Sequence, residues 1–540
     1  MLQNALNKKS YLVVDDLGDM RSVLRSMLTL FGATDIDNAK NGADAIHKME
    51  SKKYDVVLCD YNLGAGKDGQ QVLEEARHRH LISVSTAFIM ITAENTVTKV
   101  LGAIEYEPDG YLNKPFTKDL LRSRLEKVLT KKLDLRPIDL AMKQKDYAKA
   151  IQLLDERIAS KPKNLGELIR LKGDICVRSG ALTEAAALYE GVLAAREMTW
   201  ARMGLGKACY GLKKFEDAKQ IFQDLIDAND RFTAAYDWLA RTLKALGDVQ
   251  GSQQVLTTAV KISPKAILRQ QELGALAMEN NDYDTAEAAF RQAVELGKHS
   301  IHKHPKLYVG LTESRLSSAD EKQKQSAFKI IQQMQREFKG DLETEVYAAI
   351  TTAMAHRGLG EEEKALESLA LAEQLFERFG SHASPDLTLS MAKLNAGFDD
   401  EDKAKALFLT VIKNNHDDDE FLREVEAALN ASGFAELARE LISSTRKEII
   451  ALNNEGVRLV ADGQIAEAIG LFEKAVEGMS GNKAINLNAA KVLIMHMEKN
   501  GLDTQFLAKA KQYLERVQTL DPNYKGLPKL FERLNKLVNR

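Results

Sequence analysis

Three carboxylates, one hydroxyl and one amine stand at the ends of apolar runs in the first quarter of the sequence. Asp15 and Asp16 follow "SYLVV", Asp60 follows "YDVVLC", Thr92 ends "FIMIT" and Lys114 follows "GYLN". If these runs end together, the carboxylates repel one another and require a hard cation, and Mg²⁺ suits carboxylate, carbonyl and water oxygens. Beside that cation one carboxylate can attack phosphorus, while the hydroxyl and the ammonium group bind the remaining phosphoryl oxygens. Taken alone, the acidic pair would also suit the cap of a following helix.

The elements that would position these side chains are strands alternating with helices. "SYLVVDD", "YDVVLCD", "TAFIMITAE", "GYLNKPF" and the weaker "ATDIDNA" predict strands, and their near-continuous hydrophobicity favours a sheet that is buried on both faces. "DMRSVLRSMLTLFG" predicts a helix that ends at Gly32, with an apolar face of Val23, Leu24, Met27, Leu28 and Phe31. The alternation predicts an α/β fold with a doubly wound, five-stranded parallel sheet. Ligands of such sheets lie at the carboxyl ends of the strands, where the polar residues stand.

Residues 9–130 resemble the receiver domain of bacterial response regulators, the chemotaxis type included. The resemblance is carried by the acidic pair, the lone Asp60 after the third strand, "TAE" after the fourth and "KPF" after the fifth. It implies a flavodoxin-like fold in which Asp60 accepts a phosphoryl group from a sensor histidine kinase. It also implies that Thr92 and Lys114 bind the phosphoryl group, and that Thr92 and Tyr111 act as the switch pair, although Tyr111 would equally suit a plain core position.

The same resemblance implies the metal ligands and the residues that tune dephosphorylation. Mg²⁺ would be held by Asp16, Asp60 and the main-chain carbonyl of Asn62, with Asp15 acting through a bound water. Asn62 and Glu94 stand two residues after Asp60 and Thr92, beside the path of the attacking water, and imply a short-lived phosphoryl group. Receivers also place a cis peptide bond before the proline that corresponds to Pro115. One departure is the loop "YNLGAGKDG" after Asp60, which lacks the usual proline and is about one residue longer.

The rest of the chain shows helical periodicity and a repeat. Ala150, Ala185, Ala218, Ser252 and Ala286 are spaced by 33 to 35 residues, and a large apolar residue follows each by four: Leu154, Tyr189, Phe222, Leu256 and Phe290. A Gly or Ala often stands twelve residues before the small residue, at Gly173, Gly206, Ala240 and Gly274. The pattern resembles the tetratricopeptide repeat, a helix pair that stacks into a superhelix. Repeats resume around Ala365, Ala404, Ala468 and Ala510.

We therefore expect two domains. Residues 1–130 would form the receiver, and residues 131–540 an all-α repeat superhelix that is regular over 131–296, irregular over 297–342 and resumed over 343–540. "TKDLLRSRLEKVLTKKLDLRPID" contains no glycine and predicts a helix that leads into the first repeat with little slack. This lead-in is expected to couple the two parts.

Bulk composition restricts the class of protein. The 540 residues carry 75 basic and 78 acidic side chains, a balance that does not indicate a nucleic-acid-binding or anionic-membrane surface. Cys59, Cys176 and Cys209 lie far apart, so neither a disulfide framework nor a zinc site is indicated. The first ten residues lack the apolar core of a signal peptide, and no run approaches the roughly 20 apolar residues of a membrane span. We expect a soluble, cytoplasmic protein.

Other motifs favour structural interpretations. "GAGK" lacks the following Ser or Thr of a phosphate loop and predicts an ordinary loop. "HSIHKHP", with His299, His302 and His304, has no acidic or cysteine partner nearby in sequence and predicts a solvated loop rather than a metal site. "DDED" and "DDDE", over 399–402 and 417–420, lack the glycine of a calcium loop and predict helix starts. Trp200, Trp238 and Phe290 predict repeat core.

The sequence thus predicts a response regulator in which phosphorylation of Asp60 controls what the repeats bind. It predicts no enzyme activity beyond the receiver's own phosphotransfer and dephosphorylation. Its expected partners are a sensor histidine kinase, protein ligands of the repeats and, through the receiver, a second copy of the chain. Two alternatives stay open: a scaffold or assembly protein with a regulatory receiver, and a nucleic-acid-binding or enzymatic output within 297–342 or 421–450.

Overall fold

The computed structural model describes residues 6–93, 108–132, 135–317, 321–380, 383–521, 524 and 526–538. The chain folds into two compact units, Met1–Leu311 and Thr312–Arg540. The first unit holds a sheet with its covering helices and the first series of helix pairs. The second unit contains helices only among its described residues.

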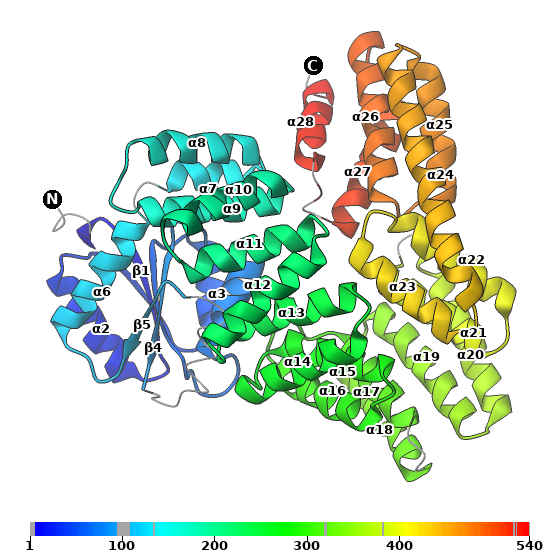
Figure 1. Cartoon of the computed structure of the whole chain (residues 1–540), viewed down its shortest axis with the longest axis horizontal. Helices are drawn as coiled ribbons and strands as arrows, with labels where there is room; N and C mark the ends of the chain where they lie inside the picture. Colours follow the sequence, from blue (N-terminus) through cyan, green and yellow to red (C-terminus); the bar gives the residue numbers. More distant parts are fainter. Residues whose placement is uncertain are drawn as a thin grey trace. The chain divides into compact units, whose positions relative to one another are not determined.

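A five-stranded parallel sheet in the order β2-β1-β3-β4-β5 organises the start of the first unit (Figure 1). Its strands are β1 (Ser10–Val14), β2 (Asp35–Ala39), β3 (Val56–Asp60), β4 (Ala87–Thr92) and β5 (Gly110–Asn113). Asp60 lies opposite Ile91, and Thr92 lies opposite Asn113. All five predicted strands are therefore confirmed, and the central β3 and β4 are buried along their whole length, as their apolar sequences require.

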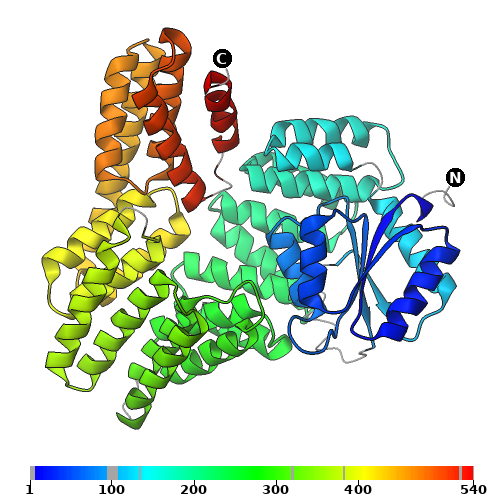
Figure 2. The ribbon, with the colours of Figure 1, turned by 180° about the vertical axis from the view of Figure 1, so that it is seen from behind.

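Helices cover both faces of the sheet because successive strand residues point to opposite faces. On one face Tyr11, Val13 and Leu58 pack against α2 (Gly18–Leu30) and α6 (Lys118–Lys131). On the other face Leu12 and Val57 pack with α3 (Gly42–Ser51) and α4 (Gly69–His78). Figures 1 and 2 show the sheet between these two layers.

The predicted apolar face of α2 is too wide by one residue. Leu24 and Leu28 are fully buried and Phe31 is nearly so, but Val23 is 46% exposed. One residue turns a helix by about 100°, so a narrow stripe around Leu24 and Leu28 leaves its neighbour Val23 outside the core. The prediction for Val23 was therefore wrong.

Helix pairs follow the sheet. In the first unit they are α7 (Arg136–Lys143), α8 (Tyr147–Ala159), α9 (Leu165–Ser179), α10 (Leu182–Ala195), α11 (Thr199–Gly211), α12 (Phe215–Ala228), α13 (Thr233–Ala245), α14 (Val249–Ile262), α15 (Ile267–Glu279) and α16 (Tyr283–Gly297), and α17 (Pro305–Leu316) begins there. The small residues at the repeat spacing are fully buried: Ala150, Ala185, Ala218, Ser252 and Ala286.

Glycines allow these helices to approach large side chains. The ring of Tyr189 is so close to both Gly173 and Gly204 that a Cβ at either glycine would lie 2.5 Å or less from ring atoms. Phe290 is wedged in the same way between Gly274 and Gly310, where the added Cβ would lie 2.8 Å and 2.6 Å away. The large residues Tyr189 and Phe290 therefore fill the space between neighbouring helices.

The second unit continues with α18 (Glu321–Glu337), α19 (Leu342–Gly358), α20 (Glu362–Glu377), α21 (Pro385–Gly397), α22 (Glu401–Asn414), α23 (Asp419–Ala431), α24 (Ala435–Ala461), α25 (Ile465–Gly478), α26 (Lys483–Asn500), α27 (Thr504–Leu520) and α28 (Leu527–Val538). Its small residues that the sequence singled out are fully buried: Ala365, Ala404, Ala468 and Ala510. Two further alanines, Ala327 and Ala438, are equally buried and mark helices that the sequence did not single out.

No repeat between Ala404 and Ala468 was predicted from the sequence. The length of α24, which has 27 residues, explains why. Ala438 follows Ala404 by 34 residues, so the first half of α24 is the second helix of one pair. The second half carries Gly456, where an added Cβ would lie 2.3 Å from the ring of Phe472 in α25. It is thus the first helix of the next pair, and the turn expected between the two is absent.

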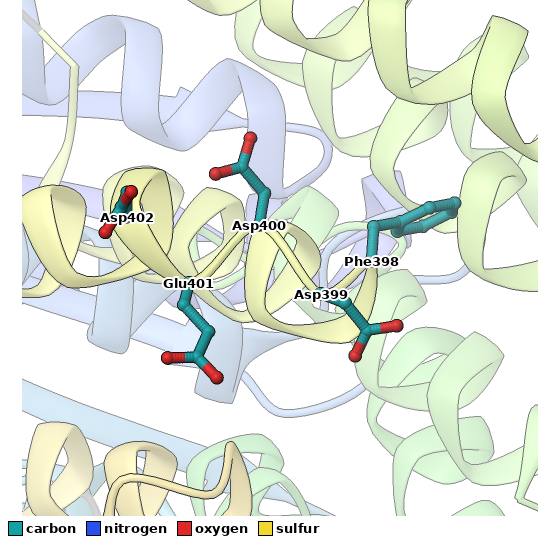
Figure 3. A pocket seen from close by; sticks show the side chains of 5 residues that line it. All are labelled: Phe398, Asp399, Asp400, Glu401 and Asp402. Atoms are coloured by element: carbon teal, nitrogen blue, oxygen red, sulfur yellow. The ribbon is translucent and has the colours of Figure 1, made fainter.

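The two acidic segments are helix starts, as predicted. Asp400 accepts a hydrogen bond from the Lys403 amide at 3.2 Å and caps α22, and Asp418 does the same for Phe421 and α23. A shallow hollow at the start of α22 is lined by Phe398 and the residues 399–402. Figure 3 shows its carboxylates pointing in different directions, so they do not converge on a common ligand.

No helix in the described part of the chain is both long and apolar enough to cross a membrane.

Candidate functional site

The carboxyl ends of β1 and β3 bring Asp15, Asp16 and Asp60 together. One carboxylate oxygen of each lies within 4.8 Å of the others, with Asp15 and Asp60 buried and Asp16 exposed. The Asp15 amide donates to the Ala39 carbonyl at 3.2 Å, which continues the β1–β2 ladder up to the acidic pair. The convergence follows from the parallel sheet, because all strands end at the same edge.

The Arg21 side chain fixes the backbone of the acidic pair Asp15 and Asp16, a role that the sequence did not indicate. Its guanidinium donates to the carbonyl oxygens of Asp15 and Asp16 at 2.6 and 3.0 Å. The Asp15 carboxylate also accepts a hydrogen bond from the Leu17 amide at 2.9 Å. One of its oxygens is therefore already engaged at the start of α2. The backbone of the pair is therefore fixed, while the carboxylate of Asp16 stays accessible.

Lys114 reaches the acidic cluster from the end of β5. Its Nζ lies 2.9 Å from Asp15 Oδ2 and 3.1 Å from Asp60 Oδ2. Burial disfavours the charged amine, but the hydrogen bond to Asp15 and the charges of Asp60 and Asp15 outweigh it and raise the pKa of Lys114. Its backbone is held by a bond from the Lys114 amide to the Thr92 carbonyl at 2.7 Å. The Lys114–Pro115 bond is cis, as predicted.

Asp60 is 6% exposed and lies at the bottom of the site. Burial is the largest influence on its carboxyl and raises its pKa to about 6, although Lys114 opposes this effect. Asp15 adds to the rise because two carboxylates in one site disfavour a second negative charge. The site therefore concentrates negative charge that a single lysine balances only in part.

The structure places all but one of the other predicted residues. Thr92, nearly buried, ends β4 beside Asp60, and Tyr111 is half-buried on the α3–α4 side of the sheet. Asn62 is exposed, and its side chain accepts from the Gly64 amide at 3.3 Å. Glu94 lies outside the described residues, so its placement stays a prediction.

The donor set fits a hard divalent cation. Three carboxylates offer oxygen ligands within one small space, and the exposed Asp16 leaves that space open to solvent. Among the residues that the structure describes, no second group of His, Cys, Asp and Glu side chains has this arrangement.

Comparison with known proteins identifies this part of the chain. Residues 11–126 match the response regulator receiver domain, and residues 177–246 and 270–296 match tetratricopeptide repeats. The chain is 30% identical over 121 residues to the chemotaxis protein CheY of Pseudomonas aeruginosa. The matched segment covers 22% of this chain and 93% of that protein. The chain belongs to the response regulator receiver family.

Further relatives match the receiver alone. Chemotaxis protein CheY-3 of Vibrio cholerae is 30% identical over 132 residues, 24% of this chain and 97% of that protein. Among solved structures, Vibrio cholerae CheY4 is 26% identical and covers 22% of this chain and 98% of its own, with a TM-score of 0.21. A two-component response regulator from Clostridium difficile is 27% identical over 23% of this chain and 96% of its own, also with a TM-score of 0.21.

The receiver contacts the repeats at residues that the sequence did not connect. His302 lies 2.9 Å from Glu74 of α4, and its ring meets His78 edge to face at 6.3 Å. Lys67 of the "GAGK" loop donates to the His299 carbonyl at 3.0 Å. The prediction that "HSIHKHP" is a solvated loop was therefore wrong for His302. Its acidic partner lies 228 residues away in sequence and next to it in space.

A second contact joins the receiver to the first repeat helix. Asp139 of α7 is 7% exposed and accepts from the Ser83 hydroxyl and the Val84 and Ser85 amides at 2.8 to 3.1 Å. Arg136 pairs with Asp55 at 2.8 Å. These polar contacts fix α7 against the loop between α4 and β4 and against Asp55, which directly precedes β3.

Proposed function

We propose that this protein is a two-component response regulator in which phosphorylation of Asp60 controls the protein interactions of its repeats. The observation that carries the proposal is the convergence of Asp15, Asp16, Asp60 and Lys114 at one edge of the sheet, in a chain that also carries tetratricopeptide repeats. We further propose the domain limits given above, with a receiver over 1–130 and the repeats over 131–540.

In this proposal an Asp60 carboxylate oxygen attacks the phosphorus of a kinase phosphohistidine. The P–N bond breaks, the histidine nitrogen leaves with the electron pair and takes up a proton, and an aspartyl phosphate forms. Mg²⁺, held by Asp16, Asp60 and the Asn62 carbonyl with Asp15 in reach, would screen the negative charge of the incoming group.

The chain's own residues complete the chemistry. Lys114 already lies 3.1 Å from Asp60, so its ammonium is close to the place that a phosphoryl oxygen would take. Thr92 ends the neighbouring strand and would donate its hydroxyl to a second oxygen, with Tyr111 following as the switch residue. Asn62 is exposed within the loop that follows Asp60 and would guide the water that later hydrolyses the acyl phosphate.

The partners follow from the two parts of the chain. The receiver implies a histidine kinase, and the repeats imply protein ligands, whose identity depends on side chains of the helix pairs. The proposed location is the cytoplasm. The segments 297–342 and 421–450 fold into α17, α18, α23 and α24, and their described residues contain no metal-binding cluster.

The proposal is tested by phosphorylating the full-length chain with acetyl phosphate and measuring its intact mass. We expect one phosphoryl group in the presence of Mg²⁺ and none after EDTA. Asp60→Asn should abolish the mass increase, and Asp19→Asn, which removes an exposed carboxylate from the start of α2, should leave it unchanged. Equal labelling of Asp60→Asn would overturn the assignment.

A further inference from the structure

The receiver's α4 is held by the connection between α16 and α17. Besides the Lys67 and His302 contacts, the Gln71 side-chain amide donates to the Leu296 carbonyl at 3.4 Å, and the Ser300 hydroxyl to Glu74 at 3.4 Å. Glu74 is 7% exposed although it carries a carboxylate. Buried charges in proteins are normally paired, so this carboxylate depends on the repeat segment for its partners. We call these interactions of residues 67–78 with residues 296–302 the α4 contact.

The repeat segment of the α4 contact is longer than its counterparts. The connections before α9, α11, α13 and α15 contain three to five residues, whereas the connection between α16 and α17 contains seven, 298–304. The packing of the helices continues across it, because Gly310 of α17 meets the Phe290 ring as Gly204 meets Tyr189. The additional residues are therefore not needed for stacking, and they include His299, Ser300 and His302, which contact the receiver.

The receiver side of the α4 contact is joined tightly to Asp60. The Gly69 amide donates to the Tyr61 carbonyl at 2.8 Å, and a Cβ at Gly69 would lie 2.2 Å from the Asp60 carbonyl oxygen. Asp68 and Gln71 form a capping box that fixes the first turn of α4. Only the eight residues 61–68 separate the phosphoacceptor strand from α4, and that loop carries Lys67.

The loop of residues 61–68 also contacts the repeats through Tyr61. Lys265, between α14 and α15, lies with its ammonium 5.9 Å from the centre of the Tyr61 ring. Lys67 also pairs with Glu75 at 2.7 Å, so the loop is bound to α4 and to the repeats at once. A change in the backbone of residues 61–68 must therefore break or rebuild contacts to the repeats.

We infer that the α4 contact is an intramolecular latch, formed while Asp60 is unmodified and released by its phosphorylation. In the structure Lys114 pairs with the carboxylates of Asp15 and Asp60. Phosphorylation draws Lys114 and the Asn62 carbonyl to the new group and its cation, and residue 62 lies within the loop that carries Lys67. Release frees the repeat surface around 265 and 296–302 for a protein partner, so this inference rests on the proposed function and names its interaction surface.

Hydrogen exchange on the full-length chain tests the latch. Phosphorylation of Asp60 is first confirmed by intact mass, so that a failure of the proposed function is seen separately. In the phosphorylated chain we expect faster exchange over 69–78 and 296–304. The contact between Asp139 and residues 83–85 does not involve the 61–68 loop and should keep its protection. Full phosphorylation with unchanged exchange at the α4 contact would overturn the latch and leave the proposed function standing. So would equal loss of protection at both contacts.

A variant pair gives an independent test, since weakening a contact that phosphorylation opens should favour the phosphorylated chain. Glu74→Gln combined with His302→Gln removes the carboxylate and the imidazole ring that lie 2.9 Å apart, and the change at Glu74 keeps the side-chain shape. We expect faster exchange over 296–304 in the unmodified chain and a ratio of phosphorylated to unmodified protein that is higher by about fivefold or more. His304→Gln alters an exposed histidine of the same connection and serves as the control. A ratio like that of the control, with protection of β3 showing that the receiver is folded, would refute the latch.

Discussion

Replacing Gly204 by Ala tests the packing that holds the repeats in place. The new methyl group would lie 2.3 Å from Cζ of Tyr189, roughly 1 Å closer than the ordinary contact range of 3.4–4 Å. The ring is 1% exposed and cannot retreat, because a Cβ at Gly173 on its other side would also lie only 2.5 Å away. The helix α11 must therefore move away from α10.

Two opposing effects set the magnitude. Alanine favours the helical state of α11 by about 1 kcal/mol relative to glycine. Overpacking a tight core costs about 1–3 kcal/mol, and the upper end applies here because both sides of the ring are fixed. We expect Gly204→Ala to destabilise α10 and α11 by about 2 kcal/mol net. Gly191→Ala in α10 is the matched control, since its Cβ meets nothing within 4 Å, and it should stabilise by up to about 1 kcal/mol.

Native-state hydrogen exchange measures this difference locally, which suits a chain of two compact units, for which a single two-state transition is not expected. A loss of about 2 kcal/mol speeds exchange of the α10–α11 amides by roughly 30-fold, because 1.4 kcal/mol is tenfold. Tyr189→Leu should relieve most of the cost, so the two substitutions together should be less harmful than their sum. Equal protection in Gly204→Ala and Gly191→Ala would show that the ring is not wedged.

Three further outcomes are expected. Lys114→Ala should destabilise the receiver by about 3 kcal/mol, because it leaves the buried Asp15 and Asp60 carboxylates without their amine, and added Mg²⁺ should recover part of the lost protection of β1 and β3. Asp139→Asn removes the charge from three hydrogen bonds and should weaken the docking of α7 by about 1.5–3 kcal/mol, seen as faster exchange over 136–143. Asn62→Leu, at an exposed position, should lengthen the lifetime of the phosphoryl group, measured as the decay of the phosphorylated mass after removal of acetyl phosphate; an unchanged decay would exclude a role for Asn62 in guiding water.

The sheet and the acidic cluster could be predicted because their signals are local. Each strand is a short apolar run that ends in a polar residue, and parallel strands bring their ends to one edge. The proximity of Lys114 to Asp15 and Asp60 was therefore predictable, although the three residues stand in separate segments of the sequence. Arg21 was not, because its guanidinium binds carbonyl oxygens, which leave no mark on the sequence. Val23 was misplaced because an apolar side chain at the edge of a helical stripe gives no signal of its own exposure.

The repeats were predictable as long as their spacing stayed constant. Ala327 follows Ala286 by 41 residues, seven more than the regular step, so the pattern was lost although the residue is fully buried. At Ala438 the spacing was regular, but the continuous helix α24 removed the turn that marks a pair. Both failures concern connections between helices rather than the helices themselves.

The place where the repeat pattern breaks is also the place where the repeats contact α4. A helix pair that only stacks on its neighbours gains nothing from a longer connection, and residues 298–304 leave the Gly310–Phe290 packing intact. His302 in that connection had no partner nearby in sequence because Glu74 and His78 belong to a different fold that precedes the repeats. Loops tolerate insertions at low entropic cost, so a contact to another domain is most easily added in a connection. A break in a regular repeat, combined with side chains that require a partner, therefore indicates where a superhelix meets something other than itself.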